Sequence, residues 1–286
     1  MKKKIEKWQV RHKVCLLFLL ICFLIAGCGI NQTNEGADVQ SSTEGLDVWF
    51  FACSEDADSI LLQTESADIL IDTGIEADSE ALLEKLRKLE VDDIELLILT
   101  HPDKDHIGGA GLILDTFQVE QVIQTSCIKG SKLQQKLEQK LEDNPGEHQI
   151  YIPQLSQNAS FGELQLTIYP PKESEYENAN NYSIGVLAEY NGKSFFFAGD
   201  AKKKRIQELL EENLPDVDVY KIAHHGRDNG ASTELIEQLR PEYAVVTGVY
   251  AEEKTMKALR QMGTRLFSTY EKDVHFSVKD GVLDVR

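Results

Sequence analysis

The sequence has few cysteines and a shortage of positive charge. Its five cysteines include no CxxC pair, so a cysteine-rich zinc site is not expected. Lysine and arginine number 30 against 48 aspartate and glutamate residues, which gives a formal net charge of −18 at pH 7. Because so acidic a surface repels polyanions at long range, the composition argues against avid non-specific binding to DNA in the absence of a local basic patch.

The sequence also lacks a long hydrophobic run. Residues 14–26 are apolar, but a helix that crosses a membrane needs about 20 such residues. Lysines precede this run and Ile25-Ala26-Gly27-Cys28 ends it, an order typical of a secretory signal. The end of the run resembles the lipobox of bacterial lipoproteins. We therefore expect residues 1–27 to be a signal peptide and Cys28 to carry the lipid that anchors the protein to the extracytoplasmic face of the cell membrane. The alternatives are an uncleaved anchor and an ordinary signal peptide in which Cys28 is coincidental.

The rest of the chain is expected to form a tether and one domain. Residues 28–45 are mostly polar and offer little to bury, as in a flexible linker. No internal linker divides residues 46–286, a length that one domain can reach. Cys53 and Cys127 remain in this domain, and they could pair outside the cell or stay as apolar thiols. The sequence leaves both possibilities open.

Apolar patterns predict strands in both halves of the domain. Short strands are expected at 46–51, 59–64 and 67–71, and a buried strand at 96–99. Asn191-Gly192 predicts a hairpin between strands 183–190 and 193–198. Further strands are expected at 119–124, 149–152, 164–169, 217–222, 243–247, 274–278 and 282–285, and helices at 79–89, 109–117, 131–142, 202–212, 232–239 and 252–262. The fold class is therefore α/β, a four-layer αβ/βα sandwich of two packed sheets with helices outside.

Two histidines and two aspartates fall within six residues directly after the buried strand. They are His101, Asp103, Asp105 and His106, and Gly108-Gly109 follows them. Imidazole nitrogens and carboxylate oxygens are ligands for divalent cations, and glycines let the backbone pass close to such a site. A metal site is therefore expected here, and a solvated polar turn is the alternative.

This segment resembles the HxHxDH signature of metallo-β-lactamase-fold hydrolases, with Asp103 in place of the middle histidine. The HxDxDH form followed by two glycines is similar to the C-terminal hydrolase domain of ComEC-type competence proteins. Further matches follow in the right order along residues 46–286: Asp58-Ser59-Ile60, Ile71-Asp72-Thr73-Gly74, Asn181 to Ser183, Phe197 to Asp200, and Lys221 to Gly226. The resemblance thus covers the whole domain and implies the metallo-β-lactamase fold for a free-standing, competence-related relative.

The resemblance also implies roles for the matching residues. His101 and Asp103 would hold one metal, Asp105 and His106 a second, and Asp200 would lie between the two. His224 or His225 would complete the set. Asp105 and Asp200 are the expected catalytic residues. Asp105 could orient the attacking water instead of binding metal, and Asp200 would bridge the two ions. Asp58, Asp72, Asn181 and Ser183 would lie behind the ligands and orient them through hydrogen bonds.

The donor set bears on the choice of metal. Asp103 in place of a histidine would give the metal position of His101 and Asp103 an oxygen ligand instead of a nitrogen ligand. This shifts the preference of that position from zinc towards manganese or magnesium. A further histidine expected between the first cluster and Asp200 has no clear counterpart, since His148 comes too early. We therefore expect one or two divalent ions, Mn²⁺ or Zn²⁺ first and Mg²⁺ next, with the position of His101 and Asp103 weak.

The leading hypothesis for function is a metal-dependent hydrolase of phosphodiesters that acts outside the cytoplasm. Lys202 and Arg227 could bind substrate phosphates, although charged runs also form solvated helix faces. The acidic composition favours nucleotides or single-stranded nucleic acid over duplex DNA. A lactone, thioester or β-lactam hydrolase of the same fold is one alternative. A surface lipoprotein that binds metal or nucleic acid without turnover is another, and the sequence does not indicate an oligomeric state.

Overall fold

The computed structural model describes residues 44–143 and 147–286. The predicted signal peptide, Cys28 and most of the expected tether lie outside these ranges. In the described ranges, no helix combines the length and apolarity needed to cross a membrane.

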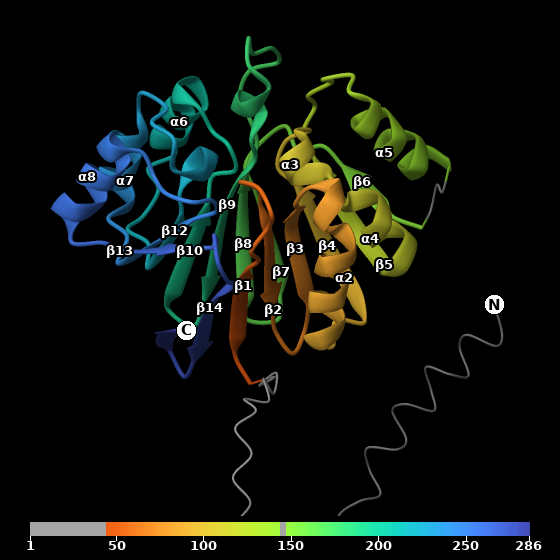
Figure 1. Cartoon of the computed structure of the whole chain (residues 1–286), viewed down its shortest axis with the longest axis horizontal. Coiled ribbons are helices and arrows are strands. Elements are labelled where there is room, and N and C mark those ends of the chain that lie inside the picture. The colour runs from red at the N-terminus through yellow and green to blue at the C-terminus, as the bar shows by residue number, and fades with distance from the viewer. Residues whose placement is uncertain (1–43, 144–146) are drawn as a thin grey trace, which may run out of the picture. The chain divides into compact units, whose positions relative to one another are not determined.

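Two β-sheets face each other, with helices on both outer faces (Figure 1). The first sheet has the strand order β15-β14-β1-β2-β3-β4-β5-β6 and the second has the order β13-β12-β11-β10-β9-β8-β7. The strands of the first sheet are β1 Leu46–Phe50, β2 Ser59–Gln63, β3 Asp68–Thr73, β4 Asp93–Leu99, β5 Gln118–Gln124, β6 Gln149–Tyr151, β14 Val274–Lys279 and β15 Val282–Val285. Those of the second sheet are β7 Gln157–Phe161, β8 Leu164–Tyr169, β9 Gly185–Tyr190, β10 Lys193–Phe197, β11 Val219–Lys221, β12 Tyr243–Val246 and β13 Arg265–Ser268.

The helices form two groups, one on each side of the sheet pair (Figure 1). Helices α2 Ser79–Lys88, α4 Ala110–Thr116 and α5 Lys132–Asp143 cover the first sheet, and α6 Lys203–Leu210, α7 Ser232–Leu239 and α8 Glu253–Met262 cover the second. Short helical turns complete the fold: α3 Lys104–Ile107, and the 3₁₀ turns η1 Glu76–Asp78, η2 Ala179–Tyr182 and η3 Ala223–Gly226. The predicted four-layer sandwich is confirmed.

The continuous apolar run at the end of β4 explains how the layers hold together. Leu96 and Ile98 pack between the two sheets, whereas Leu97 and Leu99 pack against the helices of the first sheet. Successive side chains of a strand point to opposite faces, so a strand buried on both faces must be apolar at every position. The second sheet has its own core under α6, α7 and α8.

The direction of the strands brings the polar loops together. Strands β3, β4 and β5 run parallel, as do β10, β11 and β12. The carboxyl ends of parallel strands meet at the same edge of a sheet, so the loops after β3 and β4 are neighbours, as are the loops after β10, β11 and β12. These loops carry the residues that the sequence singled out.

The structure also corrects details of the sequence prediction. The hairpin turn is as expected, with φ values of 46° at Asn191 and 77° at Gly192. Strands β7 and β13 were not predicted, and β4 begins at Asp93 rather than at residue 96. Cys53 and Cys127 are free, so the disulfide left open by the sequence is not formed. Burial raises the pKa of the Cys53 thiol to about 12 and that of Cys127 to about 11.

Candidate metal centre

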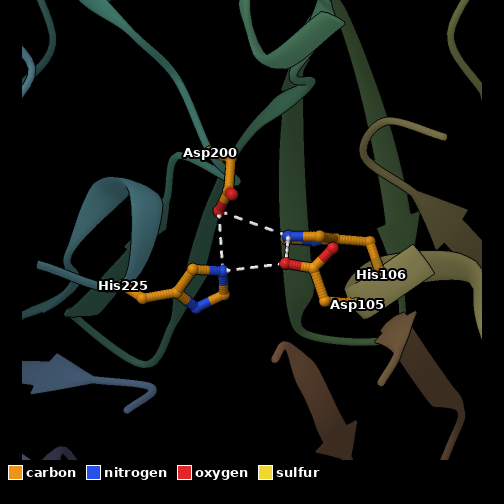
Figure 2. Close-up of side chains that lie close together, drawn as sticks. All are labelled: Asp105, His106, Asp200 and His225. Carbon is orange, nitrogen blue, oxygen red and sulfur yellow. Dashed lines mark ion pairs between the residues drawn. The ribbon is translucent and has the colours of Figure 1, made fainter. Parts of the chain in front are cut away.

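Four side chains from three segments of the chain converge on one point (Figure 2). His106 Nε2 and His225 Nε2 lie 3.2 and 3.3 Å from the same oxygen, Oδ1 of Asp200. Asp105 Oδ2 lies 3.4 Å from His225 Nε2 and 3.9 Å from His106 Nε2. The possible ligand atoms of all four residues lie within 4.8 Å of one another. We call this group the four-residue cage.

Local backbone structure places each member of the cage. Asp105 and His106 lie in α3, directly after β4, and Gly108 ends this turn. A Cβ atom at Gly108 would lie 2.3 Å from the backbone nitrogen of Glu76, so only glycine lets α3 pack this close to η1. Asp200 follows β10 at the end of the hairpin, and His225 follows β11 with a left-handed φ of 52°. Such a conformation is uncommon for histidine and turns the ring toward the cage.

The donor atoms of the cage fit a divalent cation. His106 Nε2, Asp200 Oδ1 and His225 Nε2 are buried and have no hydrogen-bond partner, and the same is true of His101 Nε2. Buried polar atoms without partners are rare in proteins because leaving them unpaired costs free energy. Two imidazole nitrogens and two carboxylate oxygens are a common ligand set for transition-metal ions. The residues present therefore suit the metal that the sequence led us to expect.

The charged groups of the cage shift one another's pKa values. Burial opposes ionisation of Asp200, but the adjacent His225 and His106 hold its pKa well below the usual range. Burial alone would lower the pKa of His225, yet the carboxylates of Asp200 and Asp58 raise it to about 9. The pKa of His106 is likewise raised well above its ordinary value, mainly by Asp200 and Asp72 acting against burial. The carboxylates thus favour positive charge at this point.

A carboxylate orients His106 from behind. Asp72 Oδ2 lies 2.7 Å from His106 Nδ1, so this nitrogen donates to Asp72 and Nε2 faces the cage. Thr100 donates to both oxygens of Asp72, from its backbone nitrogen at 2.8 Å and its hydroxyl at 2.7 Å. The ring of His106 is therefore held in one orientation.

His225 is oriented in the same way by other groups. Its Nδ1 lies 3.0 Å from the backbone oxygen of Thr247 and 3.4 Å from Asp58 Oδ1. Asp58 in turn accepts a hydrogen bond from the Thr247 hydroxyl at 2.5 Å and forms an ion pair with Lys221. Both Asp58 and Lys221 are buried. Lys221 Nζ also lies 3.9 Å from Asp200 Oδ1, so its positive charge is next to the cage.

Three predicted ligands lie beside the cage rather than in it. The ring of His101 lies 4.1 Å from that of His106, and burial lowers its pKa, which favours the neutral form that binds metals. His224 Nε2 lies 3.9 Å from Asp200 Oδ2, and its Nδ1 lies 2.8 Å from Asn229 Oδ1. The carboxylate of Asp103 instead lies 2.8 Å from Lys129 Nζ. Asp103 is thus not brought to the cage.

Of two further residues that were predicted to orient the ligands, Ser183 contacts Asp200 and Asn181 does not. Ser183 accepts a hydrogen bond from the backbone nitrogen of Asp200 at 3.0 Å, so it contacts the backbone of a cage residue. Asn181 does not reach Asp200, since its side chain accepts from the backbone nitrogen of Arg205 at 3.3 Å. The neighbouring Asn180 takes that position, and its Nδ2 donates to Asp200 Oδ2 at 3.2 Å.

The two predicted phosphate-binding residues, Lys202 and Arg227, carry charges that act on His224. Burial lowers the pKa of His224, and the positive charges of Arg227 and Lys202 act in the same direction. Arg227 also forms an ion pair with Asp56 at 3.1 Å. His148 lies elsewhere, with its Nδ1 2.8 Å from the backbone oxygen of Val119.

Sequence reasoning missed several residues that shape the centre: Thr100, Lys129, Asn180 and Thr247, and the part played by Lys221. Only Thr100 and Lys221 carried a usable signal, since Thr100 is adjacent to His101 and Lys221 lies in the segment matched by the family resemblance. The others act through contacts between segments that are far apart in the sequence.

Comparison with known proteins identifies the family of the chain. The model of the Metallo-beta-lactamase superfamily matches residues 55–248. ComE operon protein 3 of Bacillus subtilis (strain 168) is 27% identical over 188 residues, which cover 63% of this chain and 24% of that protein. Recombination protein 2 of Haemophilus influenzae is 28% identical over 191 residues, which cover 65% and 22%. Competence protein ComA of Neisseria gonorrhoeae is 24% identical over 221 residues, which cover 74% and 29%.

The chain therefore spans about a quarter of the length of these relatives. Among solved structures, the metallo-beta-lactamase fold protein YhfI from Bacillus subtilis has a TM-score of 0.55 at 12% identity, covering 85% of this chain and 100% of that one. CmlA, a diiron beta-hydroxylase from Streptomyces venezuelae, has a TM-score of 0.54 at 12% identity, covering 82% and 54%. At this identity the two structures support the fold alone. The chain belongs to the metallo-β-lactamase superfamily, and within it resembles ComEC-type competence proteins.

Proposed function

We propose that the protein is a metal-dependent hydrolase that cleaves phosphodiesters outside the cytoplasm. The observation that supports it is the four-residue cage, in which two imidazoles and two carboxylates converge on one point. The facing atoms of His106, Asp200 and His225 are buried there without hydrogen-bond partners. A cluster of perturbed titratable groups of this kind is typical of an active site. Members of the metallo-β-lactamase superfamily are usually metal-dependent hydrolases, in keeping with this reading.

The residues of the cage have separate tasks. A divalent ion bound there would lower the pKa of a water molecule and polarise the phosphoryl oxygen. His106 and His225 are each oriented through Nδ1, so their Nε2 atoms are free to bind. Asp105 is the most exposed member, with 23% of its side chain accessible against 3% for Asp200. Asp105 is therefore the carboxylate placed to orient the attacking water, while the buried Asp200 lies between the two imidazoles of the cage.

The donor set also guides the choice of cofactor. Two nitrogens and two oxygens suit Mn²⁺ or Zn²⁺, whereas Mg²⁺ prefers oxygen ligands almost exclusively. We propose Mn²⁺ or Zn²⁺ as the cofactor, with Mg²⁺ as a weaker substitute.

The surroundings of the cage favour an anionic substrate. The positive charges of Lys202 and Arg227 act on His224, whose Nε2 lies 3.9 Å from Asp200 Oδ2. Arginine and lysine at such a position suit phosphate oxygens. The name of the relative Recombination protein 2 points to nucleic acid and supports the same choice. With a net charge of −18, a nucleotide or a single strand is the better substrate than duplex DNA.

The proposed location rests on the first 28 residues. Cys28 follows Ile25-Ala26-Gly27, and a diacylglycerol on its thiol would hold the protein on the membrane surface. Metabolic labelling with palmitate tests this step. We expect label in the wild-type chain and none in Cys28→Ser. Label that persists in the variant would refute the anchor.

The proposed activity is tested with the full-length chain in detergent. Mn²⁺, Zn²⁺ or Mg²⁺ is added, and the substrates are bis-p-nitrophenyl phosphate, single-stranded DNA and nitrocefin. We expect metal-dependent cleavage of the two phosphodiesters, a loss of at least about 100-fold in Asp105→Ala, and full activity in the control Asp47→Asn. Turnover of nitrocefin alone would identify a β-lactam hydrolase. Metal binding without any turnover would identify a binding protein.

A further inference from the structure

The carboxylate of Asp103 is set apart from the four-residue cage. In the HxDxDH segment its neighbours Asp105 and His106 join the cage, whereas Asp103 Oδ1 pairs with Lys129 Nζ at 2.8 Å. The side chain of Lys129 is 44% exposed and that of Asp103 is 20% exposed, so the pair is partly open to solvent. Lys129 approaches from the loop between β5 and α5, 26 residues further along the chain.

The loop that carries Lys129 is held in place by a buried glutamine. Gln134 Oε1 accepts hydrogen bonds from the backbone nitrogens of Lys129 and Gly130, at 2.8 and 3.0 Å. Its Nε2 donates to the backbone oxygen of Cys127 at 2.7 Å. A buried side chain that satisfies three backbone groups fixes the path of the loop. The Lys129 ammonium is thereby presented to Asp103 from a defined backbone position.

Asp200 divides the centre into two halves. Its Oδ1 faces His106 and His225, the imidazoles of the cage. Its Oδ2 lies on the other side, 3.9 Å from His224 Nε2 and 3.2 Å from Asn180 Nδ2. A second ion on that side would need further ligands from His101 and Asp103. The Nε2 atom of His101 is buried and has no hydrogen-bond partner. Asp103 is the only carboxylate of the HxDxDH segment outside the cage, and it forms an ion pair with Lys129.

We propose that Lys129 competes with a second divalent ion for Asp103, so that the protein binds one ion tightly, in the four-residue cage, and a second ion only weakly. This inference rests on the proposed metal centre, and it assigns to Lys129 control over the number of ions that each chain binds. A lysine ammonium paired with a carboxylate both removes a ligand and repels a cation that approaches it. It also leaves a fixed positive charge beside Asp103, where a second ion would otherwise balance the charge of a phosphate.

Mn²⁺ binding to the full-length, untagged chain in detergent tests the proposal without an activity assay. Free Mn²⁺ is measured by electron paramagnetic resonance during titration, and bound metal is counted by elemental analysis after dialysis. We expect one tight ion per chain in the wild type. In Lys129→Ala we expect two, with the second affinity raised about 10-fold or more. Lys129→Arg keeps the ion pair and should behave as the wild type.

Two further variants make the result specific. Lys132→Ala removes the same charge from the same segment but leaves Asp103 paired, so it should still bind one tight ion. Lys129→Ala combined with Asp103→Asn should lose the second ion again, because the freed carboxylate is gone. Circular dichroism checks that each variant is folded.

Each other outcome decides against the proposal. Two tight ions in the wild type would show that Lys129 does not restrict the centre. An unchanged second affinity in Lys129→Ala would show that another group limits it. A chain that binds no Mn²⁺ at all would refute the metal centre itself, whereas one ion in every variant would refute only the role of Lys129.

Discussion

Asp72 and His106 are 34 residues apart in the sequence, yet Asp72 Oδ2 and His106 Nδ1 lie 2.7 Å from each other. Asp72 adopts a left-handed φ of 58° at the end of β3, where its carboxylate also binds Thr100. This contact decides which nitrogen of His106 faces the cage. The geometry of the metal centre thus depends on a residue that does not enter it.

We predict that Asp72→Asn weakens Mn²⁺ binding by about 10- to 100-fold, the usual effect of losing a group that orients a ligand. Asparagine tolerates a left-handed φ, so the fold should survive the change. The neutral amide of asparagine accepts a weaker hydrogen bond from His106 Nδ1 than the charged carboxylate does. Titration with Mn²⁺ measures the affinity.

Asp47→Asn is the matched control for this variant. Asp47 Oδ1 lies 2.6 Å from His275 Nε2, an aspartate–histidine contact that involves no member of the cage. We expect no change in Mn²⁺ affinity here. Equal losses in both variants, or none in Asp72→Asn, would contradict the orienting role of Asp72.

We also predict that a chelator lowers the thermal stability of the protein. An ion that binds only the folded state stabilises it by about 2.7 kcal/mol when its concentration is 100 times Kd. For a domain of this size, that corresponds to roughly 5–10 °C in Tm. Differential scanning calorimetry with Mn²⁺ and with EDTA measures the difference. In Asp200→Asn the difference should largely disappear, and a difference of full size would show that the ion binds elsewhere.

Much of the fold could be predicted because most elements carry a clear apolar pattern. Strand β8 and helix α7 were predicted with the observed bounds, since each alternates buried and exposed positions with the period of its type. The two missed strands, β7 and β13, are the edges of the second sheet. No residue of β7 or β13 is fully buried, so neither has the apolar run that marks a central strand.

The site could be predicted only where its residues are neighbours in the sequence or match a family motif. The spacing of His101 to His106 indicated metal ligands, but spacing does not show that Asp103 turns to Lys129 while Asp105 turns to the cage. Asn180 and Asn181 differ by one position in a 3₁₀ turn, and only the first reaches Asp200. Which side of a turn faces the site is decided by tertiary packing.

A third prediction concerns the buried ion pair of Lys221 and Asp58 next to the cage. Lys221 and Asp58 are 1% exposed, and Lys221 Nζ also donates to the backbone oxygen of Gly199 at 3.2 Å. Lys221→Met leaves the Asp58 carboxylate without its partner, which costs about 3–5 kcal/mol of unfolding free energy. The double variant with Asp58→Asn should lose less than the sum of the single variants. Urea unfolding in EDTA measures all three, and strictly additive losses would refute the coupling.

The last prediction concerns Asp68, which lies in the first sheet away from the cage. Its Oδ1 is buried without a partner, and burial raises its pKa to about 7, with the charges of Glu95, Asp92 and Asp93 acting in the same direction. The folded protein therefore holds this proton more tightly than the unfolded chain. Stability must then fall as the pH rises from about 4 to about 7, and the full cost is present above pH 7.

Asp68→Asn removes this ionisation and should stabilise the protein at pH 8 by roughly 0.5–2 kcal/mol, a gain typical of relieving unfavourable charge. The gain should shrink as the pH is lowered from 7 to 5, because the wild-type carboxyl becomes neutral in the folded state. Urea unfolding in EDTA at pH 5, 6, 7 and 8 measures it. Asp280→Asn, at an exposed turn with φ 52°, should show no such dependence on pH. A gain that stays constant from pH 5 to 8 would show that ionisation of Asp68 is not its cause.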